Sequence, residues 1–231
     1  MKEPLVSVVL PVKDGESYLE EALRSILDQS YRRIELIVVD GNSTDRSREI
    51  ALSVEGVRCI QQTGTGLSDA WNQGIEASEG ELTAFQDSDD RWLPGKLEAQ
   101  VEVLKQRPDL AGVIGHVRFF IASDSQGPPG MRPDVLSGDH PAPMPGTLLV
   151  RREVFDEVGL FDPGYVLAPD IDWFARVKDA GLELGTIPRL LLDKRFHEDN
   201  LSHSDPELYR AEMVRVFRAS AARQRARTGS G

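Results

Sequence analysis

The sequence predicts an α/β fold in which a mostly parallel central sheet is flanked by helices. The first observation behind this prediction is that short apolar segments rich in β-branched residues alternate with segments whose apolar residues recur at helical spacing. The second is that acidic side chains directly follow several of the apolar segments. Alternating strands and helices favour right-handed crossovers and parallel strands, and such sheets bind ligands beyond the carboxyl ends of their strands.

The first 106 residues predict four units of strand and helix. The strands are apolar enough to be covered on both faces, and we expect them at residues 5–12, 34–40, 56–62 and 81–85. A helix is expected after each strand. The four helices are predicted from a capping box of Ser17 with Glu20, from Ser43 or Thr44 to Ser53, from Leu67 to Ala77 and from Pro94 to Gln106.

The second half of the chain is less regular. Residues 122–146 hold six prolines and four glycines, which predicts a long loop, either an active-site lid or a disordered segment. Order is expected to return at residue 146. The ordered elements of this half are predicted as a strand near residues 112–120, a helix at 170–181, two short strands at 182–188 and 189–197, and a last helix that starts near Asp205.

Composition excludes several classes of function. The 231 residues carry 27 basic and 38 acidic side chains, a net charge of −11, which argues against a nucleic-acid partner. Cys59 is the single cysteine, so no intrachain disulfide can form, and we expect a buried thiol. No apolar run is long enough to span a bilayer, and the N-terminal one is too short for a signal peptide, so a cytoplasmic protein is expected.

Charge is uneven along the chain. From Asp205 onward there are six arginines and three acidic residues, which leaves −14 on the rest of the chain. Two interpretations of this basic helix stay open: a solvated face, or peripheral contact with anionic lipid at the inner face of the cell membrane.

Three aspartates follow the fourth predicted strand in "LTAFQDSDDRW", residues 82–92. Asp87 and Asp89 are two positions apart, which places both carboxylates on the same side of an extended backbone. Paired carboxylate oxygens suit Mg²⁺ or Mn²⁺, and protein-bound Mg²⁺ often shares its coordination with substrate phosphates. A capped turn is the alternative interpretation. At the ligand-binding edge of a parallel sheet, a metal site is favoured.

Other polar residues are predicted near the same edge. Asp40 ends the second strand, where a nucleotide is commonly bound, and Ser43 and Thr44 offer capping oxygens that leave it free. Asp170 and Asp172 open a helix, where one can cap and the other can act as a general base with a pKa raised by apolar surroundings. His197 and His203 are either structural residues or, for His197, a metal or diphosphate contact.

Six segments resemble the family 2 inverting glycosyltransferases of the GT-A fold. They cover roughly residues 4–204 and are, in order, "VSVVLPVKDGESYLEEALRSILDQSY", "ELIVVDGNSTDRS", "GLSDAWNQGIEASEGELTAFQDSDD", "GTLLVRREVFDEVGLFD", "DIDWFARVKDAG" and "RFHEDNLS". The resemblance implies a GT-A domain at residues 1–204, with a nucleotide-sugar-binding half at 1–106 and an acceptor-side half at 107–204. A C-terminal helix and tail at 205–231 would follow.

The resemblance also implies roles for individual residues. Asp170 matches the catalytic base, which takes the proton from an acceptor hydroxyl. Asp89 would ligate the divalent metal, Mg²⁺ or Mn²⁺, and His197 would contact the metal or the diphosphate. The donor, a nucleoside-diphosphate sugar with uridine favoured, would contact Pro11, Val12, Asp14, Asp40, Asn72, Asp87 and Ser88. The acceptor is expected to be a saccharide, a lipid-linked molecule or another hydroxyl compound in polysaccharide or glycoconjugate assembly.

The sequence departs from the family pattern at three places. Pro169 stands where an acidic residue often precedes the base, so that Asp172 becomes the base if the alignment slips by two. Trp71 replaces a frequent arginine, so that donor binding would depend on Asn72, Lys13 or the metal, and Gln86 replaces an apolar residue. Two alternatives therefore stay open: a sugar nucleotidyltransferase, which the loop "PVKDGES" disfavours, and a non-catalytic subunit that binds sugar nucleotides.

Overall fold

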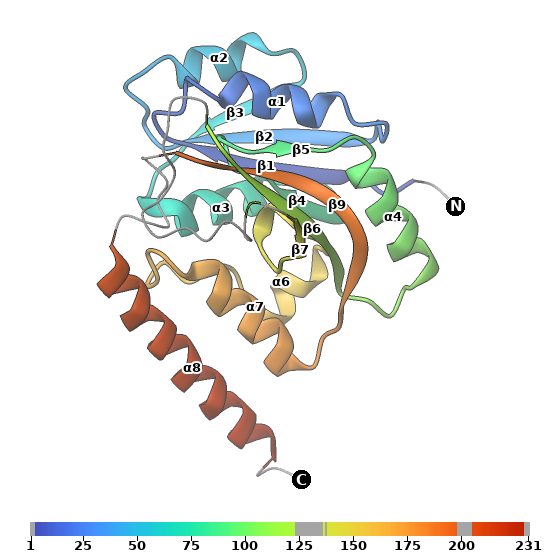
Figure 1. Cartoon of the computed structure of the whole chain (residues 1–231), viewed down its shortest axis with the longest axis vertical. Helices are drawn as coiled ribbons and strands as arrows, with labels where there is room; N and C mark the ends of the chain where they lie inside the picture. Colours follow the sequence, from blue (N-terminus) through green and yellow to red (C-terminus); the bar gives the residue numbers. More distant parts are fainter. Residues whose placement is uncertain (1–2, 123–135, 137, 198–204, 229–231) are drawn as a thin grey trace.

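The computed structural model describes residues 3–122, 136, 138–197 and 205–228, and its centre is one nine-stranded sheet (Figure 1). The strand order is β3-β2-β1-β4-β8-β6-β9-β5, and β7 pairs with β6 at the side of this path. The strands are β1 (Val6–Val12), β2 (Ile34–Asp40), β3 (Val57–Gln61), β4 (Leu82–Phe85), β5 (Arg91–Trp92), β6 (Gly112–Ile121), β7 (Asp139–Pro141), β8 (Leu149–Arg151) and β9 (Leu184–Phe196).

Helices cover both faces of the sheet (Figure 1). One hydrophobic cluster joins the sheet to α1, α2 and α4, and a second joins its other face to α3, α6 and α7. The helices are α1 (Leu19–Leu27), α2 (Ser47–Ser53), α3 (Gly66–Ala77), α4 (Lys96–Gln106), the 3-10 turn η1 (Pro145–Thr147), α6 (Glu153–Val158), α7 (Pro169–Ala180) and α8 (Pro206–Thr228).

The first half of the sheet is parallel. β3, β2, β1 and β4 are neighbours in this order, and each pair runs in the same direction. Every residue of β1 is buried, with Val8 in the first hydrophobic cluster and Val9 in the second. Burial on both faces explains why this strand is apolar without alternation.

The second half of the sheet is mixed. β8 runs antiparallel to β4 and β6, whereas β6 and β9 run parallel to each other. β5 and β7 add antiparallel pairs to β9 and β6. The predicted α/β fold with a central sheet between helices is therefore confirmed, and its parallel order extends from β3 to β4.

The two short strands expected at residues 182–188 and 189–197 are wrong, because β9 is a single strand of 13 residues. Its pairing with β6 shifts register next to His116, where Ile187, Pro188 and Arg189 lie opposite one residue. Proline cannot donate to a β-ladder and is therefore found at such bulges. The proline marks an irregularity within the strand and not its end.

Two predicted helix starts are also wrong. The capping box of Ser17 with Glu20 does not form: α1 begins at Leu19 without a side-chain cap, and the carbonyl of Gly15 accepts the first hydrogen bonds. Glu20 instead pairs with Arg24 along the helix. The second helix, α2, begins at Ser47 and not at Ser43 or Thr44. The side chains of Ser43, Asp45 and Ser47 accept hydrogen bonds from the backbone of the loop after β1.

Other expectations have simple outcomes. Part of the loop predicted at residues 122–146 forms β7 and η1, and residues 123–135 and 137 lie outside the described chain. Cys59 is a free thiol. It is only partly buried, whereas a buried thiol was expected, and its burial raises its pKa. Within the described ranges, no helix combines the length and apolar character that crossing a membrane requires.

A prediction follows from Gln86, which is fully buried and has no hydrogen-bond partner for either end of its amide among the described residues. Replacing it by methionine removes two unsatisfied polar atoms at similar volume, so Gln86→Met should stabilise the fold by about 1–3 kcal/mol. Urea denaturation measures this change. The matched control is Gln29→Met, which should destabilise, because the Gln29 amide donates to the carbonyls of Ser25 and Leu93 and accepts from the backbone of Leu97.

Candidate active site

The carboxyl ends of β1, β2 and β4 meet at one edge of the sheet. Val12 pairs with Asp40, and the backbone N–H of Gln86 donates to the carbonyl of Val9, so the turns after these strands are neighbours. Three aspartates follow β4 directly, at positions 87, 89 and 90. Parallel pairing therefore gathers polar side chains where α/β sheets bind ligands.

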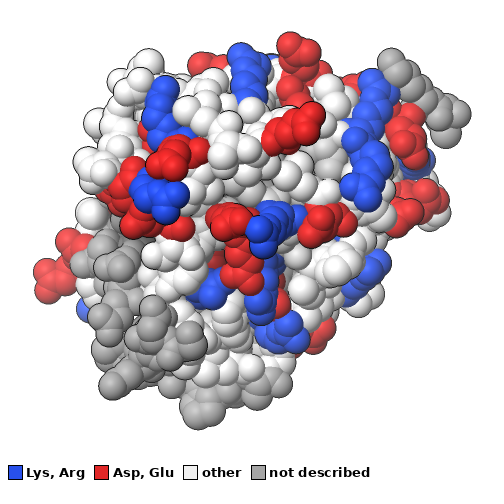
Figure 2. Space-filling view, turned by 90° about the horizontal axis from the view of Figure 1, so that it is seen from above, with Lys and Arg blue, Asp and Glu red and all other residues white. Residues whose placement is uncertain are grey.

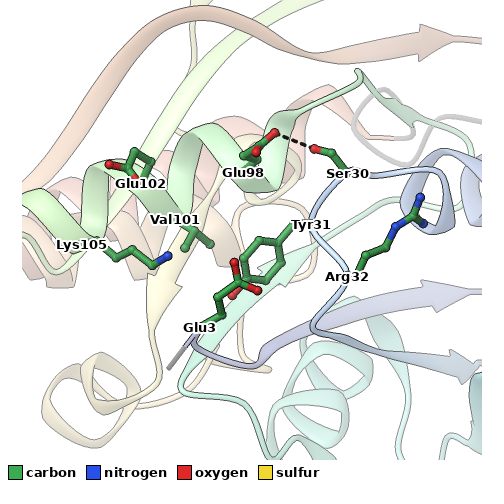
Figure 3. A pocket seen from close by; sticks show the side chains of 8 residues that line it. All are labelled: Glu3, Ser30, Tyr31, Arg32, Glu98, Val101, Glu102 and Lys105. Carbon is green, nitrogen blue, oxygen red and sulfur yellow. Dashed lines mark hydrogen bonds between the residues drawn. The ribbon is translucent and has the colours of Figure 1, made fainter. Parts of the chain in front are cut away.

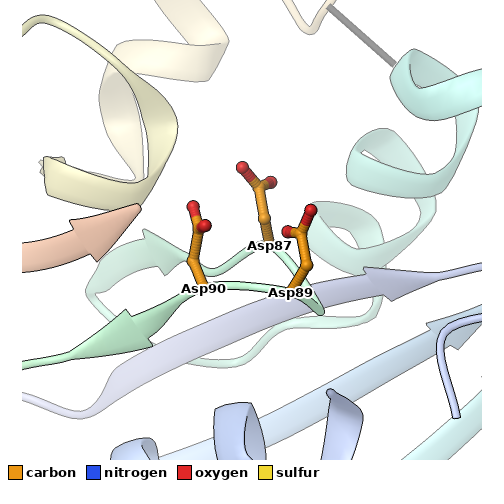
Figure 4. A group of neighbouring side chains, drawn as sticks. All are labelled: Asp87, Asp89 and Asp90. Carbon is orange, nitrogen blue, oxygen red and sulfur yellow. The ribbon is translucent and has the colours of Figure 1, made fainter. Parts of the chain in front are cut away.

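The carboxylates of Asp87, Asp89 and Asp90 form a cluster. One oxygen from each lies within 4.8 Å of the others. Figure 4 shows the three side chains rising from the turn after β4 toward the same side. Like charges at this separation repel one another strongly, so the cluster requires positive charge from elsewhere in the fold.

Lys194, on β9, supplies that charge. Its Nζ lies 3.0 Å from an oxygen of Asp87 and 3.0 Å from an oxygen of Asp90. Burial opposes the charge on Lys194, but the negative charges of Asp90, Asp87 and Asp89 outweigh this effect and raise its pKa well above the ordinary value. The lysine therefore stays protonated and joins the turn after β4 to β9.

Asp90, which the sequence left without a role, is the anchor of this connection. It is only 1% exposed, and its second oxygen accepts a hydrogen bond of 2.8 Å from the backbone N–H of Arg195. Arg195 also donates from Nε to the carbonyl of Asp89 at 2.9 Å. Asp90 consequently neither caps the helix after it nor faces open solvent, but holds the turn against β9.

The structure brings Asp89 and His197 together, two residues that are 108 positions apart in sequence and that the sequence assigned to one metal site. His197 Nε2 lies 2.8 Å from Asp89 Oδ2. Burial favours the neutral acid, but the hydrogen bond from His197 and the charge of Lys194 lower the pKa of Asp89. His203, which the sequence analysis named as a structural residue, lies outside the described residues.

These residues fit a divalent cation. Carboxylate oxygens are hard ligands suited to Mg²⁺ or Mn²⁺, and the imidazole of His197 lies beside one of these carboxylates. Lys194 pairs with Asp87 and Asp90, whereas Asp89 pairs with His197. Asp89 and His197 are therefore the side chains that would hold an ion.

Asp170 and Asp172 open α7, and the structure gives them different surroundings. The buried carboxylate of Asp172 accepts a hydrogen bond of 2.8 Å from Arg176. Among the residues that the structure describes, no side chain donates to Asp170. Burial, together with the nearby negative charge of Asp87, raises the pKa of Asp170 to about 6. Asp170 thus has a raised pKa, and no side chain of the described residues donates a hydrogen bond to its carboxylate.

Asp40 is buried and already has partners. It is 1% exposed, accepts a hydrogen bond of 3.2 Å from the backbone N–H of Ser43, and lies 3.5 Å from the guanidinium of Arg48. Ser43 and Thr44 therefore do not free Asp40 from local hydrogen bonding as the sequence suggested.

Asp14 and Val12 help to build this edge of the sheet. Asp14 has a positive φ of 50°, and its carboxylate accepts hydrogen bonds from the backbone and hydroxyl of Thr44. The carbonyl of Val12 accepts the backbone N–H of Gly41 at 2.7 Å, while Pro11 is buried within β1. These contacts tie the loops after β1 and β2 together.

Asn72 and Trp71 lie on α3, and their contacts are structural. Both ends of the Asn72 amide bind the backbone of Phe161, at 2.8 and 2.9 Å. Trp71 is buried against Phe161 and Phe85, so it fills the core at the place where the family often has arginine. Ser88 is partly buried in the turn after β4, close to Gly15. The predicted donor contact of Asn72 stays a prediction.

Sequence reasoning missed Lys194 and Arg195. The available signal was the run Asp193-Lys194-Arg195, three charged residues inside an apolar strand. Charged residues in a strand interior are rare unless they are paired. Asp193 is buried and pairs with Arg91 and Arg118, which confirms that the run lies in an ionic network.

A cavity of about 200 Å³ lies elsewhere, lined by residues that precede β1 and β2 and by α4 (Figure 3). Glu3 and Arg32 come before strands, so this cavity is at the amino edge of the sheet, opposite the aspartate cluster.

Basic and acidic side chains are interspersed on the face shown in Figure 2, with no continuous basic patch there.

The fold and the carboxylates at this edge define an α/β protein of the GT-A glycosyltransferase class. The solved structure of S. aureus TarS, residues 1–349 in complex with UDP-GlcNAc, matches with a TM-score of 0.74 over 95% of this chain and 66% of that chain. At 18% identity this likeness shows the fold. The chain belongs to glycosyl transferase family 2, whose model matches residues 7–159.

Relatives in sequence are described as glycosyltransferases. An uncharacterized glycosyltransferase of Rickettsia typhi is 31% identical over 188 residues, which are 74% of this chain and 58% of the relative. The putative teichuronic acid biosynthesis glycosyltransferase TuaG of Bacillus subtilis is 37% identical over 110 residues, 46% of this chain and 44% of TuaG. The chain thus spans about half of the length of these relatives.

The contacts of Lys194 lead to a prediction. Lys194→Met leaves the buried carboxylate of Asp90 without its cation, so the free energy of unfolding in EDTA should fall by on the order of 3 kcal/mol. Urea denaturation gives this value. The control is Arg107→Met, which removes an exposed pair with Asp109 and should leave the free energy of unfolding nearly unchanged. Equal, small losses for both variants would mean that Lys194 does not hold the cluster.

Proposed function

We propose that this chain transfers a sugar from a nucleoside-diphosphate donor to an acceptor hydroxyl, with inversion at the anomeric carbon. The observation that carries the proposal is the surroundings of Asp170. Its carboxylate has a pKa raised to about 6, and its pKa responds to the charges of Asp87 and Lys194 in the aspartate cluster. A general base with a pKa near the working pH beside a candidate diphosphate site is the arrangement that such a transfer requires.

Asp170 acts as the base in this proposal. It removes the proton of the acceptor hydroxyl while the hydroxyl oxygen attacks the anomeric carbon and the nucleoside diphosphate departs. A single displacement of this kind inverts the anomeric centre. Asp172 is the poorer candidate, because its carboxylate is committed to Arg176.

The turn after β4 holds the donor. Asp87 and Ser88 take the ribose side, and Asp89 with His197 holds Mg²⁺ or Mn²⁺. A bound ion of this type supplies a Lewis acid that neutralises charge on the departing diphosphate. Lys194, 3.0 Å from Asp87, fixes the turn so that Asp89 keeps its orientation. At the neighbouring strand ends, Asp40, Asp14 and the backbone of Pro11 and Val12 line the side of the nucleobase.

The uridine diphosphate donor and the role in cell-surface polysaccharide assembly are part of the proposal. They are supported by TarS, whose structure contains UDP-GlcNAc, and by TuaG, a putative teichuronic acid biosynthesis protein. The acceptor is then a saccharide or a lipid-linked molecule. Exposed Val214 and Phe217 on the arginine-rich α8 support peripheral contact with an anionic membrane surface.

No specific observation favours either alternative from the sequence, the sugar nucleotidyltransferase or the non-catalytic subunit. Pro169 was the reason to consider a non-catalytic subunit, and it occupies the first position of α7. Proline favours this position because its fixed φ suits the helix start and its missing N–H costs no helix hydrogen bond. Its presence therefore has a structural explanation that leaves Asp170 free to act.

The donor and metal assignments predict a thermal-shift result. UDP-GlcNAc with Mn²⁺ should raise the melting temperature, because a ligand that binds only the folded state stabilises it by mass action, by about 2.7 kcal/mol at a hundredfold excess over Kd. The shift should be lost in EDTA and in Asp89→Ala. Screening other nucleotide sugars identifies the base and sugar. An Asp89→Ala protein that keeps the full Mn²⁺-dependent shift would contradict the metal assignment.

The raised pKa of Asp170 predicts a pH dependence. A carboxylate works as a base only when ionised, so kcat should fall as the pH decreases through about 6. Asp170→Asn should lower kcat by about 10²–10⁴-fold, and should raise the melting temperature at pH 7, where burial penalises the charged carboxylate. The control Asp172→Asn loses the ion pair with Arg176. It should keep the fall of kcat at low pH. If Asp172→Asn instead abolishes transfer, the base is misassigned.

A further inference from the structure

The C-terminal helix α8 lies beside α7, the helix that carries Asp170 (Figure 1). Its buried polar contacts with α7 fall at two separate places. One is directly before the first residue of α7, and the other is in the last turn of α7. The two contacts differ in their distance from Asp170, which allows their roles to be separated by experiment.

The first contact is made by Glu212, a carboxylate only 1% exposed. It accepts hydrogen bonds from three successive backbone N–H groups, those of Val166 at 2.7 Å, Leu167 at 2.8 Å and Ala168 at 2.9 Å. These N–H groups immediately precede α7 and have no partners within a helix. Successive N–H groups of this kind form a concave site for an anion. Here the anion is a side chain of the same protein.

The segment bound by Glu212 leads directly into the candidate base. Ala168 caps α7, Pro169 is its first residue and Asp170 its second. The carbonyl of Ala168 also accepts the first backbone hydrogen bond of the helix, from Asp172. Residues 166–168 therefore lead directly into the turn of α7 that carries Asp170, and Glu212 holds the backbone from which this turn starts.

Further contacts hold the two residues before this segment from both sides. On the side of α3, Ser68 donates to the carbonyl of Tyr165 at 3.3 Å. On the side of α8, Arg215 donates to the carbonyl of Gly164 and stacks 4.4 Å above the ring of Tyr165. Burial and then the charge of Asp170 raise the pKa of Tyr209, so α8 also approaches the base itself.

The second contact is made by Asp179, in the last turn of α7. Its carboxylate accepts hydrogen bonds of 2.8–2.9 Å from Ser220, Arg223 and Gln224 of α8. This buried ionic contact resembles that of Glu212 in its chemistry. It lies nine residues from Asp170, about 13 Å along the helix at 1.5 Å per residue.

We propose that Glu212 is a positioning residue for the catalytic base: by binding the backbone of residues 166–168, it orients the start of α7 so that Asp170 faces the aspartate cluster. α8 is then part of the catalytic machinery and not a detachable tail. This inference depends on the proposed function, in which Asp170 is the base. Glu212 itself contacts no substrate.

The experiment compares three variants of the full chain. UDP release from UDP-GlcNAc, or from the nucleotide sugar selected by thermal shift, is measured with Mn²⁺ and with water as the acceptor. Glu212→Gln keeps the shape of the side chain but removes the charge and turns an NH₂ group toward the backbone N–H groups. Asp179→Asn makes the equivalent change at the far end of α7. Asp170→Asn reports the loss of the base.

Glu212→Gln should lower kcat by about 10- to 100-fold, because a displacement of about 1 Å at a reacting group costs roughly 10²-fold. The donor KM should stay within about twofold of the wild type, because Glu212 lies outside the proposed donor site. Asp179→Asn should lower the melting temperature about as much as Glu212→Gln does, but should keep kcat within about twofold of the wild type. Should Glu212→Gln not fold, Glu212→Asp, which retracts the carboxylate by one methylene, replaces it with the same expectation.

Three results would overturn the inference. If Glu212→Gln keeps the wild-type kcat while Asp170→Asn loses it, the base is correct and Glu212 serves stability alone. If Asp179→Asn lowers kcat as much as Glu212→Gln, the effect is general loosening of α7. If Asp170→Asn keeps the wild-type kcat, the proposed base is wrong, and the positioning role is rejected with it.

Discussion

The carboxylates of Asp87, Asp89 and Asp90 lie within 4.8 Å of one another in the turn after β4. The rest of the fold must compensate their mutual repulsion. A turn with this charge would not keep one conformation by itself, because like charges at such distances strongly disfavour each other's ionised forms. The compensation comes from β9, which brings Lys194 into the cluster and the backbone of Arg195 to Asp90. The course of β9 through the second half of the sheet is therefore a condition for the site.

The same ionic principle recurs on the side of the candidate base. Glu212 and Asp179 are buried carboxylates whose charges are offset by backbone N–H groups in one case and by side chains of α8 in the other. Buried charges are tolerated only when such partners exist. Asp170 contrasts with both: burial raises its pKa, and no described side chain donates to it. A carboxylate left without side-chain donors among paired ones is the one suited to proton transfer.

Local sequence patterns predicted the elements better than their ends. The strands of the parallel half and the helices after them were anticipated, because apolar periodicity reports burial directly. The start of α1 was missed, because the carbonyl of Gly15, and not the side chain of Ser17, receives the first hydrogen bonds. β9 was divided in two, because Pro188 signals a break in sequence but lies at a bulge in the sheet. The first outcome was decided by a backbone contact within the preceding loop, and the second by pairing with the distant strand β6.

The sequence by itself determined the α/β class, the carboxylates after β4, and the pairing of Asp89 with His197 as candidates for one site. These features follow from composition and spacing along the chain, together with the resemblance to a known family. Only the tertiary structure decided that Lys194 neutralises the cluster, that Asp90 anchors it to β9, and that Glu212 binds the segment before Asp170. These interactions join residues 44 to 107 positions apart, and no local pattern encodes them. A charged side chain in sequence does not reveal its partner, because the partner is chosen by strand pairing and helix packing.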